Sequence, residues 1–142
     1  MNTEASAKAP WHLWAVGVLS LLWNAAGAVT IVMAQAGKLP GIKPDEAAYY
    51  AAQPMWFVAV TDVSLLAAIS GSVLLLMRKG KAVRAFALSL VAILITHAYD
   101  IAMGTSRSFA NQGAMAVNLI ILVIAVSVLL YASAMKKQGV LR

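Results

Sequence analysis

The chain has 142 residues, of which 62% are hydrophobic and 11% are charged, and it contains no cysteine. Soluble domains carry about 45–50% apolar and about 25% charged residues, so this composition indicates an integral membrane protein. The absence of cysteine excludes disulfides, thiol redox chemistry and cysteine-ligated metals. The net charge of +6 is not accompanied by a basic, aromatic-interleaved domain, which argues against nucleic-acid binding.

Four apolar runs predict four transmembrane helices that occupy most of the chain. Each run has about 20 residues or more, which is enough for a helix to cross about 30 Å of hydrocarbon. Backbone polar groups must be satisfied within a segment that crosses lipid, which favours helices over other structures. The expected fold is an all-α membrane protein, a four-transmembrane-helix bundle that forms one membrane domain over residues 1–142. The predicted helices cover residues 11–34, 55–77, 85–104 and 114–135.

The one long connection, residues 35–54, is expected at the outer face and is predicted to contain a short helix over residues 44–52. Pro44 suits the first position of a helix, and Asp45 and Glu46 suit its first turn. The short helix is expected to act either as a spacer over the bundle or as a gate.

Basic residues are distributed unevenly between the two ends of the predicted bundle. The positive-inside rule therefore places both termini in the cytoplasm. The expected location is a bacterial cytoplasmic membrane, crossed several times by the chain. Eight basic residues fall on the cytoplasmic side: Lys8, Arg78, Lys79, Lys81, Arg84, Lys136, Lys137 and Arg142. Three fall on the outer side: Lys38, Lys43 and Arg107.

Polar side chains inside the apolar runs are the candidates for a binding site. Asp62 lies about 10 Å below the outer end of its helix at about 1.5 Å per residue, and His97 lies at a similar depth in the next helix. Asp100 shares a helix face with His97 and lies nearer the surface. If the helix faces converge, a substrate-binding pocket in the outer half contains Asn24, Asp62, His97, Asp100 and Asn118. A buried acid costs about 2.5–3.5 kcal/mol on insertion, which favours a functional role, with helix packing as the structural alternative.

No catalytic set, metal site or cofactor is expected. His97 and Asp100 supply only two ligands, whereas zinc takes three or four. The two histidines of the chain, His12 and His97, are predicted near opposite faces, so they cannot flank one haem iron within a subunit. The sequence has no glycine-rich phosphate loop, GxSxG motif or HExxH motif, so we expect no enzymatic activity.

Each of the first three predicted helices carries at least one short motif. The motifs are Leu22-Trp23-Asn24 with Gly27, Pro54 with Trp56, Gly71-Ser72, and Ser89-Leu90. Together they resemble a family of small four-helix bacterial inner-membrane proteins that are often labelled as sugar transporters. The resemblance extends over residues 21–28, 49–60 and 71–90, and it implies a transport function without implying particular binding residues.

Three functions are considered on the sequence alone. A membrane enzyme that acts on lipid needs a further polar residue facing the headgroups, and none is found, which leaves two. The first is a transporter or binder of a small polar solute, working as a homo-oligomer because four helices make a thin pathway. It predicts that Asp62→Asn abolishes uptake. The second is a non-enzymatic accessory or scaffold subunit of a larger membrane complex, which predicts that fixed partners co-purify with the chain. In both cases the lipid bilayer surrounds the protein.

Overall fold

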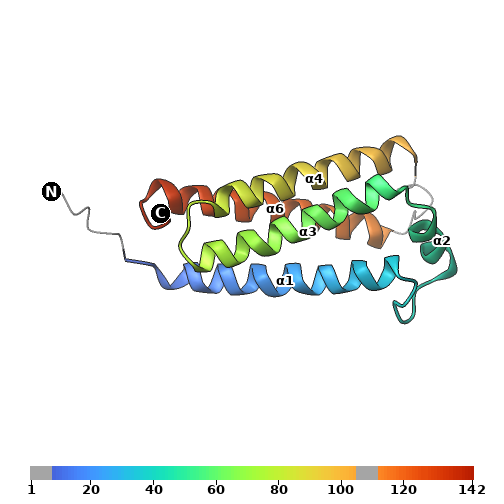
Figure 1. Ribbon diagram of the computed structural model, residues 1–142, viewed down its shortest axis with the longest axis horizontal. Helices are drawn as coiled ribbons and strands as arrows, with labels where there is room; N and C mark the ends of the chain where they lie inside the picture. Colours follow the sequence, from blue (N-terminus) through green and yellow to red (C-terminus); the bar gives the residue numbers. More distant parts are fainter. Residues whose placement is uncertain (1–7, 105–111) are drawn as a thin grey trace.

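The structure is a computed structural model that describes residues 8–104 and 112–142, with the side chains of 112–115 excepted. The described residues form five α-helices and no strand. Four of these helices are long and apolar enough to cross a membrane, which confirms the predicted all-helical fold with four candidate spans. They are α1 (Trp11–Gln35), α3 (Met55–Leu76), α4 (Ala82–Ala102) and α6 (Gln112–Lys137). Figure 1 shows them running side by side along the long axis of the molecule.

The fifth helix, α2 (Pro44–Ala52), lies at one end of the bundle and covers the residues where the sequence predicts a short helix. Pro44 lacks an N–H group that would in any case be unpaired at a helix start, and its φ is preset for a helix. Asp45 and Glu46 follow in the first turn, where negative charge interacts favourably with the helix dipole. We call this end of the bundle the α2 end. The opposite end, which holds the α3–α4 loop and Arg142, is the basic end (Figure 1).

The helix boundaries differ from the predicted ones by up to three residues. The helix α4 begins at Ala82 rather than 85, because a basic residue interrupts the apolar run without interrupting the helix. It ends at Ala102 rather than 104, because Gly104 adopts a φ of 68°, a left-handed conformation that ends helices. The helix α6 continues beyond residue 135, since Lys136 and Lys137 interact favourably with the helix C-terminus.

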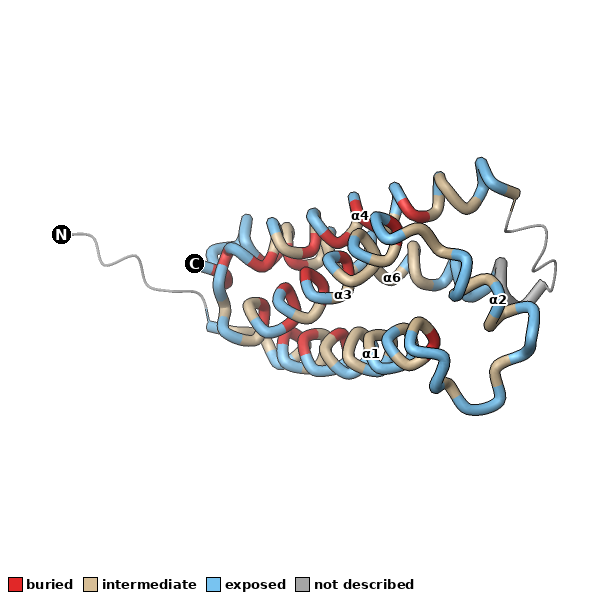
Figure 2. Tube along the Cα trace, turned by 45° about the vertical axis from the view of Figure 1, so that its right-hand side comes forward, coloured by how far each residue is buried: buried red, intermediate tan, exposed pale blue. Residues whose placement is uncertain are grey.

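The helix α3 is the central helix of the bundle. It packs most extensively against α4 and next against α1, whereas α6 packs mainly against α4. Gly71 of α3 lies against the ring of Phe86 on α4, and Gly17 of α1 lies against Leu76 on α3. Small residues at such interfaces let helix backbones approach closely. Buried positions therefore follow the inward sides of α1, α3 and α4, mainly in the half nearer the basic end (Figure 2).

Large apolar side chains cover the outward surface of the bundle. Leu19, Leu66 and Leu130, from three different helices, are 67, 65 and 64% exposed. Soluble monomers rarely expose apolar patches larger than a few hundred Å². Lipid acyl chains solvate such side chains without cost, so this surface fits a bilayer.

The segment after α6 folds back against the α3–α4 loop. Gly139 adopts a φ of 72° and reverses the chain, which lets Val140 become buried. The Arg142 N–H donates to the Arg78 carbonyl at 2.8 Å, and the Gly80 N–H donates to the Arg142 carbonyl. The Arg78 Nε donates to the Val140 carbonyl at 3.1 Å. The end of α6 is thus tied to the loop between α3 and α4.

Candidate functional site

Hydroxyl and amide side chains join α1 to α3 inside the bundle. The hydroxyls of Ser20 and Ser72 are buried and lie 2.8 Å apart. Asn24, one turn further along α1, donates from Nδ2 to the Ser20 carbonyl at 2.8 Å and to the Ser72 hydroxyl at 3.5 Å. Interhelical hydrogen bonds in membranes contribute about 0.6 kcal/mol on average, so this network chiefly selects which faces of α1 and α3 meet.

A second pair of hydroxyls joins α3 to α4. Ser64 and Ser89 lie 3.5 Å apart, and both are buried. Thr96, further along α4, donates its hydroxyl to the Ile93 carbonyl at 2.9 Å. The polar residues that are buried as a whole in the described part of the chain are all serine or threonine. A hydroxyl can pair with a carbonyl of its own helix, so it enters an apolar bundle at low cost.

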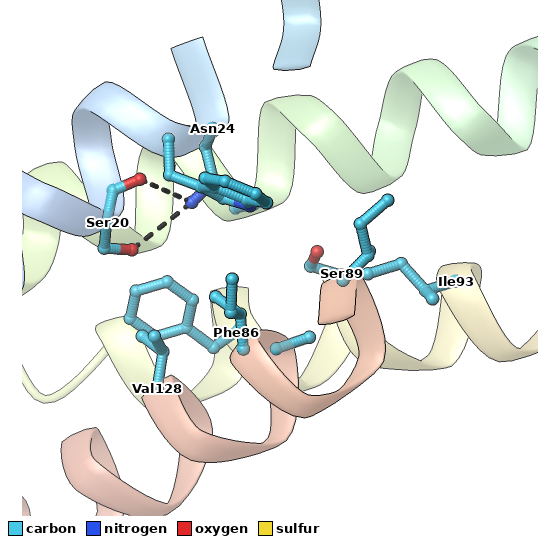
Figure 3. Close-up of a pocket in the computed structure, with 11 residues that line it drawn as sticks. Ser20, Asn24, Phe86, Ser89, Ile93 and Val128 are labelled. Carbon is cyan, nitrogen blue, oxygen red and sulfur yellow. Dashed lines mark hydrogen bonds between the residues drawn. The ribbon is translucent and has the colours of Figure 1, made fainter. Parts of the chain in front are cut away.

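A cavity of about 40 Å³ lies beside this network, where the four long helices meet. Its polar lining residues are Ser20, Asn24 and Ser89, and the other lining residues are aromatic and aliphatic. In Figure 3, Ser20 and Asn24 lie on one side of the cavity, with Phe86 and Val128 on the other. One water needs about 10–15 Å³ of such space, so the cavity has room for about three waters. A hexose does not fit in this conformation.

The side of α4 that lines the cavity continues toward the α2 end through His97 and Asp100. His97 lies four residues after the cavity-lining Ile93, and Asp100 lies three residues after His97, which keeps all three on one helix face. The Nδ1 atom of His97 lies 2.9 Å from the Ile93 carbonyl. Its Nε2 atom is buried and has no hydrogen-bond partner among the described residues. Because an unpaired buried nitrogen is costly, Nε2 is a candidate contact for a polar ligand.

Asp100 connects α4 to α2. The Tyr49 hydroxyl donates to the Asp100 carboxylate, at 3.0 Å from Oδ1 and 3.1 Å from Oδ2. Burial, followed by the negative charge of Asp100, raises the pKa of Tyr49 well above its ordinary value of 10.0. Burial also raises the pKa of Tyr50, with smaller effects from Glu46 and Asp100. Tyr49 therefore stays protonated at neutral pH and anchors α2 over the end of α4.

Asn118 shares a face of α6 with a residue that lines the cavity. It is exposed, and it precedes the cavity-lining Ile121 by three residues. At about 1.5 Å per residue it lies about 5 Å nearer the α2 end than Ile121. Four of the predicted site residues thus occupy helix sides that face the cavity or continue from it toward the α2 end. We call these four the polar track: Asn24, His97, Asp100 and Asn118.

The structure does not place Asp62 with this group. Asp62 and the buried Ser64 are two residues apart, so their side chains leave α3 about 200° from each other at about 100° per residue. By the same count Asp62 lies about 40° from Leu76, which packs on Gly17, so Asp62 is on the α1 side of α3. Its Oδ1 is buried and has no hydrogen-bond partner among the described residues. Asp62 and His97 thus leave neighbouring helices in different directions.

The polar track consists of hydrogen-bonding side chains and one carboxylate, that of Asp100, which already accepts from Tyr49. In the described ranges, no three His, Cys, Asp or Glu side chains lie together in a way that could hold a metal. The ring of His12 lies at the basic end, where Nδ1 is 2.5 Å from the Tyr131 hydroxyl. Arg107, which contributes to the predicted charge asymmetry, lies outside the described residues.

Four residues belong to the candidate site although they are absent from the predicted set. Ser20, Ser89 and Trp23 line the cavity, and Tyr49 binds Asp100. Ser89 precedes Thr96 by seven residues, a helical repeat that places both on one face and that is readable in the sequence. No sequence signal indicates the Tyr49–Asp100 contact, because it joins residues that are 51 positions apart.

Comparisons of the chain with protein-family models, curated proteins and solved structures found no match. The family resemblance in the sequence motifs therefore stays a prediction.

Proposed function

We propose that this chain is a multi-pass membrane protein that binds and transports a small polar solute by way of the cavity and the polar track. The observation that carries the proposal is a cavity between four membrane-spanning helices with hydroxyl and amide groups in its wall. The hydrogen bonds of Asn24 all use Nδ2, which leaves its amide oxygen available to a solute. Polar residues inside a transmembrane bundle commonly mark a substrate pathway.

The lining of the cavity supports a neutral solute with hydroxyl or amide groups. Ser20, Asn24 and Ser89 offer both donors and acceptors, and none of the described residues that line the cavity is charged. Trp23 adds an aromatic surface on which a sugar ring can stack. The motifs resemble a family that is often labelled as sugar transporters, and sugars are neutral solutes with hydroxyl groups. Since the cavity has room for about three waters, a larger solute requires the helices to separate.

The distribution of basic residues supports an orientation with the basic end in the cytoplasm of a bacterial cell. The start of α1 and Arg142 both lie at this end (Figure 1). Both ends of the described chain then face the cytoplasm, and the polar track leads from the cavity toward the outside.

Uptake of radiolabelled glycerol and of a radiolabelled hexose into proteoliposomes tests the proposal. Asn24→Leu replaces a polar wall of the cavity, and we expect uptake to fall about tenfold, the effect of losing one hydrogen bond of about 1.4 kcal/mol. Thr30→Val is the matched control on the same helix, because Thr30 is exposed and its hydroxyl bonds only the Ala26 carbonyl. Uptake in the control should equal that of the wild type.

Two results would contradict this function. The first is uptake of both solutes at the rate of protein-free vesicles. The second is equal uptake by the Asn24→Leu variant and the wild type. A fixed membrane partner that co-purifies with an inactive chain would instead support the accessory-subunit alternative.

A further inference from the structure

The basic end carries exposed cations that the proposed transport function does not use. None of them forms an ion pair within the described part of the chain. The acidic residues that the structure describes all lie in α2, or in the halves of α3 and α4 nearer the α2 end. We call the six exposed basic residues at the basic end the cationic cluster. They are Lys79, Lys81, Arg84, Lys136, Lys137 and Arg142.

The fold gathers this cluster from two separate elements. The Cε atom of Lys136 lies 3.4 Å from the position that a Cβ on Gly80 would occupy, so the lysine of α6 lies over the α3–α4 loop. Arg142 is held beside the same glycine, because its carbonyl accepts the Gly80 N–H. Lys79 and Lys81 flank that glycine in the sequence. Gly80 thus lies beside four basic residues: two are its sequence neighbours, Lys136 approaches with its side chain and Arg142 with its backbone.

Membrane topology alone does not account for this arrangement. The positive-inside rule acts on basic residues that flank a span, whether or not they meet in the folded protein. Like charges that are brought together repel each other, and this repulsion opposes the folding of the tail onto the loop. A bound anion would remove the repulsion, so the arrangement favours an anionic partner.

The position of the cluster along the bundle indicates the source of that anion. Trp11 and Trp14 at the start of α1 lie at the same end and are 79% and 49% exposed. Exposed tryptophans at the ends of spans sit at the depth of lipid headgroups. The cationic cluster is therefore level with the phosphates of the adjacent leaflet.

We propose that the cationic cluster binds the phosphate headgroup of an anionic phospholipid. Lys81 and Lys136 are the central contacts, because Lys81 follows Gly80 in the loop and the Lys136 side chain reaches the same glycine from α6. The site lies at the end of the bundle away from the polar track, so it neither requires nor excludes solute transport. Its ligand is a lipid of the leaflet at the basic end.

Thermal unfolding of the full chain in a neutral detergent, titrated with phosphatidylglycerol or with phosphatidylcholine, tests the proposal. We expect half-maximal stabilisation at a concentration of phosphatidylglycerol about tenfold lower than that of phosphatidylcholine. The double variant Lys81→Gln/Lys136→Gln should weaken the effect of phosphatidylglycerol about 30-fold, from the loss of two phosphate contacts. The matched variant Lys38→Gln/Lys43→Gln removes the same charge at the α2 end, and it should bind phosphatidylglycerol like the wild type.

Equal stabilisation by the two lipids, or an equal loss in both double variants, would overturn the proposal. Inorganic phosphate forms a third arm: if it stabilises the chain as much as the lipid does, the site recognises a free anion and the headgroup assignment is wrong. If the Lys81→Gln/Lys136→Gln chain does not fold, the wild type is titrated at rising sodium chloride. A weaker effect of phosphatidylglycerol at high salt is then expected, and an unchanged effect overturns the proposal.

Discussion

At the scale of single residues, the Tyr49–Asp100 hydrogen bond makes the protonation of a tyrosine depend on a carboxylate of another helix. Burial is the larger cause of the raised Tyr49 pKa, and the charge of Asp100 is the second. Asp100→Asn removes that charge, so we expect the pKa of Tyr49 to fall while burial keeps it above 10.0. Tyrosinate absorbance against pH, compared between Asp100→Asn and Asp100→Asn/Tyr49→Phe, isolates this titration. An unchanged pKa would mean that the two side chains are apart in the membrane.

The same contact predicts how stability depends on pH. Since the pKa of Tyr49 is higher in the folded chain, the folded state keeps a proton that the unfolded state loses above about pH 10. The stabilising contribution is complete below that pH and declines as the pH rises. Tyr49→Phe lacks this titration, so its unfolding temperature should fall less steeply than that of the wild type above about pH 10. Parallel curves for the two proteins would refute this contribution.

At the scale of helices, the contact between α3 and α4 depends on the absence of a side chain at Gly71. A Cβ there would lie 2.8 Å from the ring of Phe86, which is buried and has little room to move. We expect Gly71→Ala to lower the free energy of unfolding by about 1–2 kcal/mol, because overpacking outweighs the better helix propensity of alanine. Gly27→Ala is the control, since no heavy atom lies within 4 Å of its added Cβ. It should leave stability unchanged or raise it by up to about 1 kcal/mol.

At the scale of the whole molecule, the direction in which the polar track faces depends on the orientation of the bundle in the membrane. The chain has no cysteine, so single cysteines can report which side each end occupies. We expect a membrane-impermeant maleimide to label Lys43→Cys in intact cells and to label Lys81→Cys only after permeabilisation. The reverse pattern would place the basic end outside, and the proposed route of the solute would be inverted.

The sequence predicted the elements of this fold better than their relative rotation. Hydropathy located all four spans, and helix-start chemistry located α2, because both signals are local. The prediction that Asp62 and His97 meet used depth alone. The depth of a residue in the membrane follows from counting residues along its helix. The direction in which its side chain points depends on which face of α3 packs against the other helices. Ser64, Ala68 and Ser72 form that face at four-residue spacing, and Asp62 lies off it.

Other features of the molecule could not be predicted from the sequence. The cavity depends on the fit of side chains from four helices, which no single helix pattern encodes. The fold-back of the tail onto Gly80 depends on Gly139 and on pairing between backbone groups, which carry no side-chain signature. The cavity and the fold-back both arise from tertiary contacts. The transport proposal depends on the cavity, and the lipid-binding proposal depends on the fold-back.

The uneven attachment of α6 has a mechanical consequence. At the basic end this helix is held by the His12–Tyr131 hydrogen bond and by the tail that pairs with the loop. From Ala116 to Leu130, no side-chain hydrogen bond joins it to another described part of the chain, and its packing is mainly against α4. The helix α6 is therefore held more firmly at the basic end than at the α2 end. A tilt about the basic end would displace Asn118 more than Val128, so an opening of the bundle would be widest at the α2 end.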